Sequence, residues 1–296
     1  MQYIIYNIHF KLCLRVDIAL IYDVIRWEEK KILEAASRRG LSIKPIDAKN
    51  LVLDLSSSNI NLADVVFQRC ISYFRGLYLT AILESMNVKV INSFNVSMIC
   101  GNKLLTTLKL KSCSIPTPKT IIALHPESAL KALEIFNYYA VIKPIFGSWG
   151  RLVSLVKDFE TAKSVIELKS ELHNPLHEIF YIQEFVKRPP RDIRIVTVGL
   201  EPIAAEYRYS TNGEWRTNIA RGGRAEKCDL TSELEDLACR VAEAMGGGVL
   251  GIDCMESDRG LLVHEVNANV EFKGVSEASG VDVAGRIVDY LAGLKR

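Results

Sequence analysis

The chain has 296 residues, which suits one large unit or two to three packed subdomains. Lysine and arginine number 37 against 35 aspartate and glutamate residues, and the net charge of +2 argues against a dedicated nucleic-acid binder, which shows a strong basic excess. The apolar residues 1–15 are too short to cross a bilayer and lack the basic start and cleavage site of a signal peptide, so we expect neither membrane insertion nor secretion.

Strands and helices alternate from about residue 16 onward. A buried strand over residues 18–22 is followed by a helix over 28–39 that stops at Gly40. A strand over 63–68, a helix over 73–86 and an extended segment over 88–91 come next. This alternation predicts a small parallel sheet covered by helices, a Rossmann-like α/β unit.

Two further blocks follow this unit. The first has expected strands at 120–123, 140–144, 152–156 and 180–183, with helices near 127–137 and 158–170. The second has expected strands at 192–198, 202–209, 249–256 and 260–267, and helices at 232–245 and 283–291. We therefore divide the chain into an N-terminal extension (1–15), an N-terminal domain (16–112), a central subdomain (113–187) and a C-terminal subdomain (188–296), the last two being α+β.

Three oxygen-bearing side chains lie on the last two expected strands. Asp253 is on the first, and Glu265 and Asn267 are on the second, where side chains two apart point to the same face. A tight turn at 257–259 would bring Asp253 to that surface. Carboxylate and amide oxygens suit Mg²⁺ that also holds nucleotide phosphates. The alternative is a polar strand edge that faces solvent.

A lysine and a glycine-rich loop form the second signal. Lys143 ends a strand, and the loop leads into another strand, which excludes a Walker loop because that loop precedes a helix. Glycines let backbone amides approach phosphate oxygens, and the lysine adds a positive charge. The loop residues that we assign to phosphate binding are Gly147, Ser148, Gly150, Arg151 and Leu152. An ordinary Gly-Ser hairpin turn is the alternative.

Two more segments complete the pattern. The strand exit formed by Gln183, Glu184, Phe185 and Val186 is of a type that presents backbone groups to an adenine edge. The segment 217–223 places Arg221 before two glycines, which suits a mobile loop that brings a guanidinium to phosphate or carboxylate. A solvated basic loop is the alternative for this second segment.

The order of these motifs resembles the ATP-grasp superfamily in its RimK-like branch, and within it the LysX/ArgX family. The shared strings include Cys100-Gly101-Asn102-Lys103, Gly-Ser-Trp-Gly-Arg-Leu at 147–152, Arg-Asp-Ile-Arg at 191–194, Ala-Arg-Gly-Gly at 220–223 and Glu271-Phe272-Lys273. His264 stands where the family pattern has asparagine, and the segment 268–270 departs from the patterns for either amino-acid substrate.

The resemblance implies an ATP-grasp fold and an ATP-dependent ligase with one or two Mg²⁺ ions. The acyl acceptor would be α-aminoadipate or glutamate, and the acyl donor would be the C-terminal glutamate of LysW, a small acidic carrier protein in lysine or arginine biosynthesis. It further implies a cytoplasmic homo-oligomer, either a dimer or a tetramer.

The resemblance also implies roles for individual residues. Nucleotide contacts are expected from Lys103, Lys143, the glycine loop, residues 183–186, Asp192, Arg208 and Asn218. Arg221 and Asn218 are expected to be catalytic, and Asp253, Glu265 and Asn267 to bind metal. Arg194, Arg208 and Lys273 are candidates for substrate carboxylates, while Arg188, Arg191, Arg216 and Arg224 are candidates for the carrier. The alternatives are a RimK-like glutamate ligase acting on another protein or a coenzyme tail, and a non-catalytic nucleotide-binding protein.

The seven cysteines are scattered and form no Cys-x-x-Cys pair. Reduced thiols are therefore expected in preference to disulfides or a zinc site.

Overall fold

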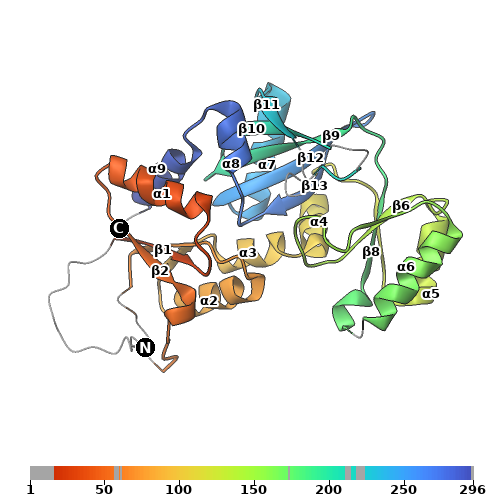
Figure 1. Ribbon diagram of the computed structural model, residues 1–296, viewed down its shortest axis with the longest axis horizontal. Helices are drawn as coiled ribbons and strands as arrows, with labels where there is room; N and C mark the ends of the chain where they lie inside the picture. The colour runs from red at the N-terminus through yellow and green to blue at the C-terminus, as the bar shows by residue number, and fades with distance from the viewer. Residues whose placement is uncertain are drawn as a thin grey trace.

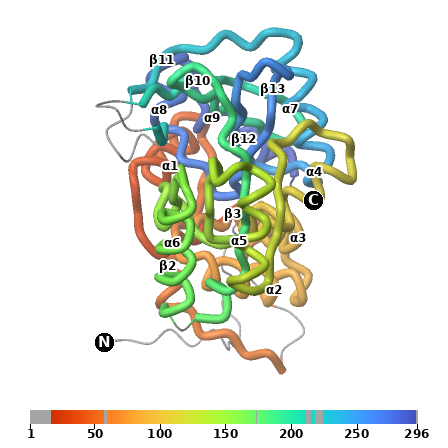
Figure 2. The backbone as a smooth tube through the Cα atoms, turned by 90° about the vertical axis from the view of Figure 1, so that its right-hand side faces the viewer, coloured from red at the N-terminus to blue at the C-terminus, as the bar shows by residue number. Residues whose placement is uncertain are grey.

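Three sheets are found in the described part of the chain, one in each of its three parts (Figure 1). The computed structural model describes residues 17–56, 60, 62–172, 174–210, 215–217 and 224–294. Turned by 90°, the C-terminal sheet lies above the N-terminal sheet, and helices α5 and α6 of the central part lie in front of the N-terminal part (Figure 2).

The N-terminal sheet is parallel, with strand order β2-β1-β3-β4. Its elements are β1 (Ile18–Tyr22), α1 (Trp27–Arg38), β2 (Ile43–Asp47), η1 (Ala48–Asn50), β3 (Val65–Gln68), α2 (Tyr73–Ser85) and β4 (Lys89–Ile91). The apolar run in β1 is buried because helices cover both faces, as is usual for parallel strands. The predicted parallel sheet is confirmed; β2, which has Pro45, was missed, and it lies at the sheet edge, where proline is tolerated.

The last helix returns to this N-terminal sheet. Helix α9 (Val283–Gly293) lies beside α1 (Figure 1), and Ile287 packs with Ile18 and Ile32 in one apolar cluster. The opposite face of the sheet packs against α2 through Leu79 and Leu83. The two ends of the described chain therefore share one core.

The central sheet is antiparallel, with order β5-β8-β6-β7. Its elements are β5 (Thr120–Ala123), α5 (Pro126–Glu134), β6 (Ala140–Lys143), β7 (Ser154–Val156), α6 (Phe159–Glu171), η2 (Pro175–His177) and β8 (Phe180–Glu184). Strand β7 begins two residues later than predicted. The reason is local, because Trp149 and Leu152 adopt positive φ angles of 58° and 56° and so keep the glycine loop out of the sheet.

The C-terminal sheet has order β11-β10-β9-β12-β13 and is also antiparallel. Its elements are β9 (Arg191–Val198), β10 (Glu201–Tyr209), β11 (Arg224–Cys228), α7 (Ser232–Met245), β12 (Val249–Ser257), β13 (Gly260–Asn267) and α8 (Lys273–Ser279). Helices α3 (Phe94–Cys100) and α4 (Lys103–Ser112) pack on this sheet with α7, through Val96 and Leu110. The sequence had given no prediction for α3, α4, α8 and β11.

Within the described ranges, no helix is both long enough and apolar enough to cross a membrane. The cysteines of the described part are unpaired, as expected. Cys13 and the extension over residues 1–15 lie outside the described residues.

Candidate active site

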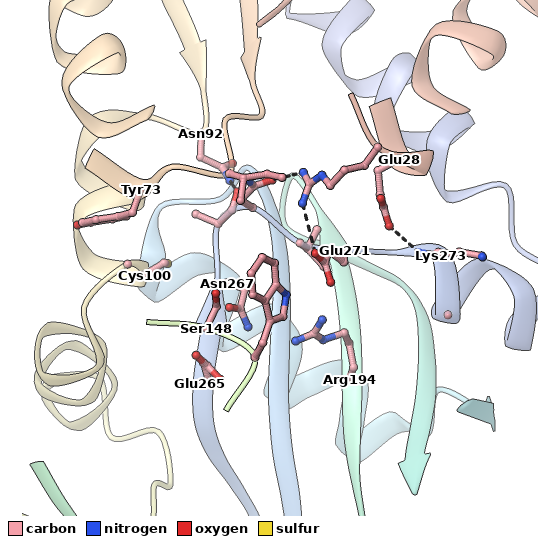
Figure 3. Close-up of a pocket in the computed structure, with 18 of the residues that line it drawn as sticks. Glu28, Tyr73, Asn92, Cys100, Ser148, Arg194, Glu265, Asn267, Glu271 and Lys273 are labelled. Atoms are coloured by element: carbon pink, nitrogen blue, oxygen red, sulfur yellow. Dashed lines mark hydrogen bonds and ion pairs between the residues drawn. The ribbon is translucent and has the colours of Figure 1, made fainter. Parts of the chain in front are cut away.

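A cavity of about 900 Å³ lies where the N-terminal domain, the glycine loop and the C-terminal sheet meet (Figure 3). Gly147, Ser148 and Trp149 of the loop line this cavity. Arg194, Glu265 and Asn267 come from the C-terminal sheet, as do Glu206 and Arg208. Large cavities lined by a few convergent polar groups are the usual location of an active site.

The side chains assigned to metal binding come together. Asp253 on β12 and Glu265 on β13 are direct partners in the antiparallel register. Asn267 donates from Nδ2 to Oδ2 of Asp253 over 3.5 Å. Val266, which lies between Glu265 and Asn267 in the strand, points to the other face and is buried in the core. The three oxygen donors therefore lie on one face, which is the face that lines the cavity.

Asp253 also forms ion pairs with two arginines, which the sequence did not predict. Arg194 donates to both of its carboxylate oxygens, each over 2.8 Å, and Arg208 lies 3.1 Å from Oδ2. Arg208 also donates to both oxygens of Asp192, over 2.8 and 2.9 Å. Burial alone would raise the pKa of Asp253, but the two arginines outweigh it and hold that pKa below its usual value. We call these four residues the arginine–aspartate ladder.

The ladder bears on whether the site fits magnesium. Glu265 and Asn267 line the cavity, whereas Asp253 is already neutralised by two guanidinium groups. No cluster of three or more His, Cys, Asp or Glu side chains suited to a metal occurs in the described part of the chain. Mg²⁺ typically takes one or two protein carboxylates and completes its shell with water and substrate phosphates. The donor set therefore fits Mg²⁺ that is shared with a nucleotide.

Lys103 joins the glycine loop to the acidic strands. It is the first residue of α4, whose amides at Leu104 and Leu105 are capped by the Asn102 side chain. Lys103 Nζ donates to the carbonyl of Gly147 over 2.6 Å and lies 3.1 Å from Oε1 of Glu265. A single lysine thus holds the loop and the predicted metal ligand at one end of the cavity.

The glycine loop is fixed from several sides. Gly147 and Gly150 have φ angles of 130° and 64°, which favour glycine. Arg151 stacks on the Trp149 ring at 4.8 Å from its centroid, and Arg216 donates to the carbonyl of Gly150 over 3.3 Å. The predicted loop residue Leu152 is largely exposed.

Lys143 lies buried beside this loop. Its Nζ donates to Oε1 of Gln183 over 2.6 Å, so one predicted nucleotide residue positions another. Burial lowers the pKa of Lys143 to about 8, and the nearby Lys103 acts in the same direction while Glu265 opposes it. The lysine therefore loses much of its charge in the free protein above pH 8.

Nucleotide affinity is expected to fall as the pH rises through about 8. Below that pH Lys143 is charged and attracts phosphate; above it, binding must first restore the proton, at a penalty of up to about tenfold in affinity per pH unit. Calorimetric titration with ATP at pH 8.5, in two buffers of different ionisation enthalpy, should show proton uptake. The Lys143→Met variant should bind more weakly and without this uptake; proton uptake that persists in the variant would contradict the assignment.

The strand exit assigned to adenine has side chains with partners in the protein. Glu184 accepts from the Lys119 amide and from Arg259, each over 2.6 Å. The Phe185 ring packs edge-on against Tyr139, and Val186 is buried. Their roles toward adenine stay predictions.

The basic residues assigned to substrates differ in their surroundings. Lys273 lines the cavity at the start of α8, where its backbone amide donates to Glu28 over 3.3 Å. Arg191 donates to both carboxylate oxygens of Glu256. Arg224 forms a single ion-pair contact of 2.6 Å with Glu226. Arg188 donates to the carbonyls of Arg191 and Trp215. Asn218 and Arg221 lie outside the described residues, as does most of their loop.

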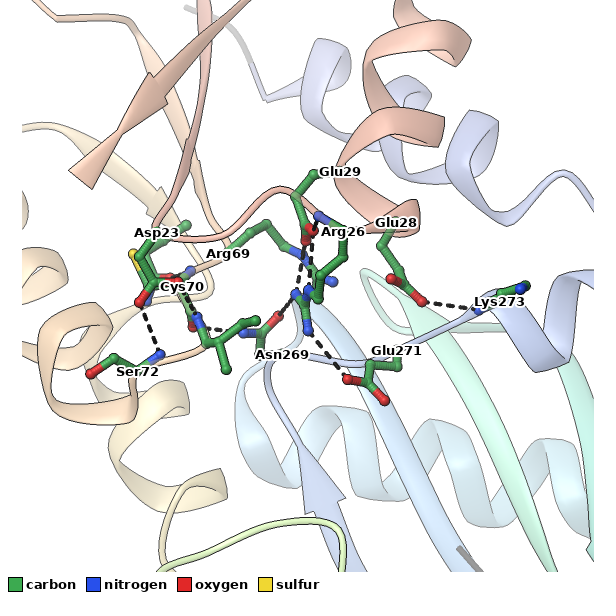
Figure 4. Close-up of polar contacts among 12 residues, drawn as sticks. Asp23, Arg26, Glu28, Glu29, Arg69, Cys70, Ser72, Asn269, Glu271 and Lys273 are labelled. Carbon is green, nitrogen blue, oxygen red and sulfur yellow. Dashed lines mark hydrogen bonds and ion pairs between the residues drawn. The ribbon is translucent and has the colours of Figure 1, made fainter. Parts of the chain in front are cut away.

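Sequence reasoning missed the N-terminal wall of the cavity (Figure 4). Arg26 donates to Glu29 over 2.8 Å and to Oδ1 of Asn269 over 3.2 Å, and it lies 3.4 Å from Glu271. Asn269 donates in turn to the Cys70 carbonyl over 2.7 Å. Arg26 and Cys70 follow strands β1 and β3, and ligands of open parallel sheets bind at such strand ends. Polar residues directly after the first strands were the signal available in the sequence.

Comparison with known proteins agrees with this architecture. The model of the RimK-like ATP-grasp domain matches residues 100–291, and the model of the LysX preATP-grasp domain matches residues 18–99. The fold is that of an ATP-grasp enzyme, and the chain belongs to the RimK-like ATP-grasp family.

Two relatives match most of the chain. The α-aminoadipate–LysW ligase LysX of Sulfurisphaera tokodaii is 37% identical over 275 residues, covering 92% of this chain and 96% of the relative. The glutamate–LysW ligase ArgX of Sulfolobus acidocaldarius is 36% identical over 275 residues, covering 93% and 97%. A crystal structure of a RimK-domain ATP-grasp protein from Sphaerobacter thermophilus superposes with a TM-score of 0.77 at 25% identity, covering 93% and 98%.

These findings confirm the predicted fold, the predicted family and the prediction of an ATP-dependent acid–amino-acid ligase. Use of ATP and Mg²⁺ follows from membership of the family. The two relatives differ in their amino-acid substrate although their identities to this chain are nearly equal. Identity alone therefore does not choose between the two substrates.

Proposed function

We propose that this enzyme uses MgATP to activate the C-terminal glutamate of a LysW-like carrier protein and joins it to the amino group of α-aminoadipate or glutamate. The match to the LysX preATP-grasp domain over residues 18–99 supports this choice within the family. The observation that carries the catalytic part is the contact of Lys103 with both Gly147 and Glu265. That contact brings the loop that we assign to phosphate binding next to the carboxylate that we assign to a divalent cation.

The residues have distinct tasks in this proposal. Lys103 and Lys143 hold nucleotide phosphates, and residues 147–152 close over them and exclude water. Glu265 and Asn267, beside Asp253, would hold one or two Mg²⁺ ions. Bound Mg²⁺ supplies charge neutralisation for the transferred phosphoryl group. The carrier carboxylate attacks the γ-phosphorus, and the amine then attacks the resulting acyl phosphate.

Carrier-dependent ADP release tests the proposal. Purified enzyme is mixed with ATP, Mg²⁺ and the carrier, with α-aminoadipate in one reaction and glutamate in another. We expect sustained ADP release with at least one amino acid, and only when the carrier is present. ADP release with another protein or with a coenzyme acceptor, and not with the carrier, would favour the other RimK-like activities. Relatives of that kind exist: the tetrahydromethanopterin:α-L-glutamate ligase of Methanococcus maripaludis is 38% identical over 205 residues, covering 68% of each chain.

Arg221→Ala is expected to slow acyl-phosphate formation far more than it weakens ATP binding. The guanidinium is assigned to the charge that develops on the transferring phosphoryl group, and loss of one such donor costs about 100-fold to 1000-fold in kcat. Single-turnover ADP formation and nucleotide Kd should be measured together. Equal losses in both would assign the arginine to ground-state binding instead.

A further inference from the structure

Glu206 is a buried carboxylate that none of the assignments above uses. It lies in the middle of β10 with only 1% of its surface exposed, and it lines the active-site cavity. Its Oε2 atom has no hydrogen-bond partner within the described ranges. A buried carboxylate oxygen without a donor is costly unless a proton or a cation satisfies it.

Near Glu206, the carboxylates outnumber the arginines by one. In the ladder, Arg208 binds both oxygens of Asp192, and Arg194 binds both oxygens of Asp253. The two arginines and two aspartates cancel, and Glu206 adds a third carboxylate. A structural counter-ion would be expected to accept a hydrogen bond from an arginine, but both guanidinium groups already pair bidentately with other carboxylates.

The chemistry of the proposed reaction calls for a group of this kind. The amino acid arrives with its amino group as an ammonium ion, whose nitrogen lone pair is blocked by a proton. A carboxylate in the cavity with one oxygen lacking a donor among the described residues satisfies the ammonium charge and is a suitable acceptor for that proton. Resting on the proposed function, we propose that Glu206 binds the ammonium group of the incoming amino acid and removes one proton from it.

The step balances in atoms and charge. One N–H bond breaks as the proton moves to a Glu206 oxygen, and the nitrogen lone pair is freed. The nitrogen then bonds to the acyl carbon while the bond from that carbon to the phosphate oxygen breaks. The second surplus proton on nitrogen leaves with the phosphate, which departs as hydrogen phosphate. Glu206 returns its proton to solvent.

Proton affinity at this position supports the geometric argument. Burial raises the pKa of Glu206 to about 7, against the lowering effect of Arg194 and Arg208 and with the help of Asp253 and Asp192. From α8, Lys273 and Glu277 line the same cavity. A base whose pKa lies near the working pH is the efficient kind.

A comparison of two nucleophiles tests whether Glu206 acts on the ammonium group or has only a structural role. The acyl phosphate is offered either the amino acid or hydroxylamine, which is largely uncharged at neutral pH and needs neither an ammonium site nor a base. Glu206→Gln, of nearly the same shape, should lower ligation of the amino acid by about 100-fold to 10,000-fold. Its carrier- and ATP-dependent hydroxamate formation should stay at the wild-type rate. Glu201→Gln, an exposed position on the same strand, is the matched control and should change neither reaction.

The pH profile gives an independent readout. In the wild type, kcat/KM for the amino acid should rise with pH through about 7 as Glu206 loses its proton; this limb should be missing in Glu206→Gln and present in Glu206→Asp. Unchanged ligation in Glu206→Gln, or parallel loss of ligation and hydroxamate formation, would overturn the assignment. A wild-type enzyme that makes neither product with the carrier would instead overturn the proposed function, and this assignment with it.

Discussion

Glu265→Gln is expected to lower kcat for carrier-dependent ADP formation by about 100-fold to 1000-fold. The substitution keeps the shape of the side chain but removes a charged oxygen donor for Mg²⁺, and it leaves Lys103 without its carboxylate partner at 3.1 Å. Charge neutralisation of the phosphoryl group requires both the bound Mg²⁺ and a correctly placed Lys103. Steady-state ADP release at saturating ATP and increasing Mg²⁺ is the measurement, and the apparent requirement for Mg²⁺ should rise.

The same hairpin offers a control for Glu265. Asp258 lies in the turn between β12 and β13, and its side chain is almost fully exposed. Asp258→Asn removes the same charge from the same hairpin at a distance from the cavity, and turnover should not change. Normal turnover in Glu265→Gln would remove this residue from the metal site.

Asp253→Ala is expected to destabilise the protein as well as inactivate it. The variant leaves the partly buried guanidinium group of Arg194 without its carboxylate, and the buried Arg208 loses one of two partners. Breaking a buried ion pair by removing one member typically costs about 3–5 kcal/mol. Urea unfolding followed by circular dichroism should show a lower midpoint with an unchanged slope.

An exposed ion pair provides the control for the Asp253→Ala variant. Asp236 forms an exposed ion pair with Arg240 on α7, four residues along the helix. Because surface pairs contribute little, Asp236→Ala should leave the unfolding midpoint nearly where it is. Similar shifts in the two variants would show that the ladder is not a structural unit. The Asp253 result also means that loss of activity in that variant alone does not demonstrate metal binding.

Local signals made several elements predictable. The helix expected over 232–245 is α7 as observed, because Thr231 caps its start, its apolar face follows helical spacing, and Gly246 ends it with a φ angle of 102°. The missed helices α3 and α8 have only seven residues each, too few for a periodic pattern to stand out. Strand β11 is short and three of its five residues are charged, so it has no strand-like alternation.

In the candidate site too, local contacts were predictable from the sequence and long-range contacts were not. Asp253 and Glu265 belong to one hairpin, so a short turn and the two-residue period of strands were enough to predict that they face each other. The ladder depends on β9 lying between β10 and β12, an order that no local pattern encodes. The contact of Arg26 with Glu271 joins residues 245 positions apart.

By itself, the sequence determined the class of enzyme, the parallel N-terminal sheet, and the pairing of Asp253 with Glu265 across a hairpin. It did so because these features rest on short-range periodicity, turns and motif order. Only the tertiary structure decided that Asp253 is neutralised by two arginines, that Glu206 is an additional buried carboxylate beside them, and that Arg26 lines the cavity. Those properties arise from burial and from the pairing of distant strands, which set the electrostatic environment of a side chain independently of its neighbours along the chain.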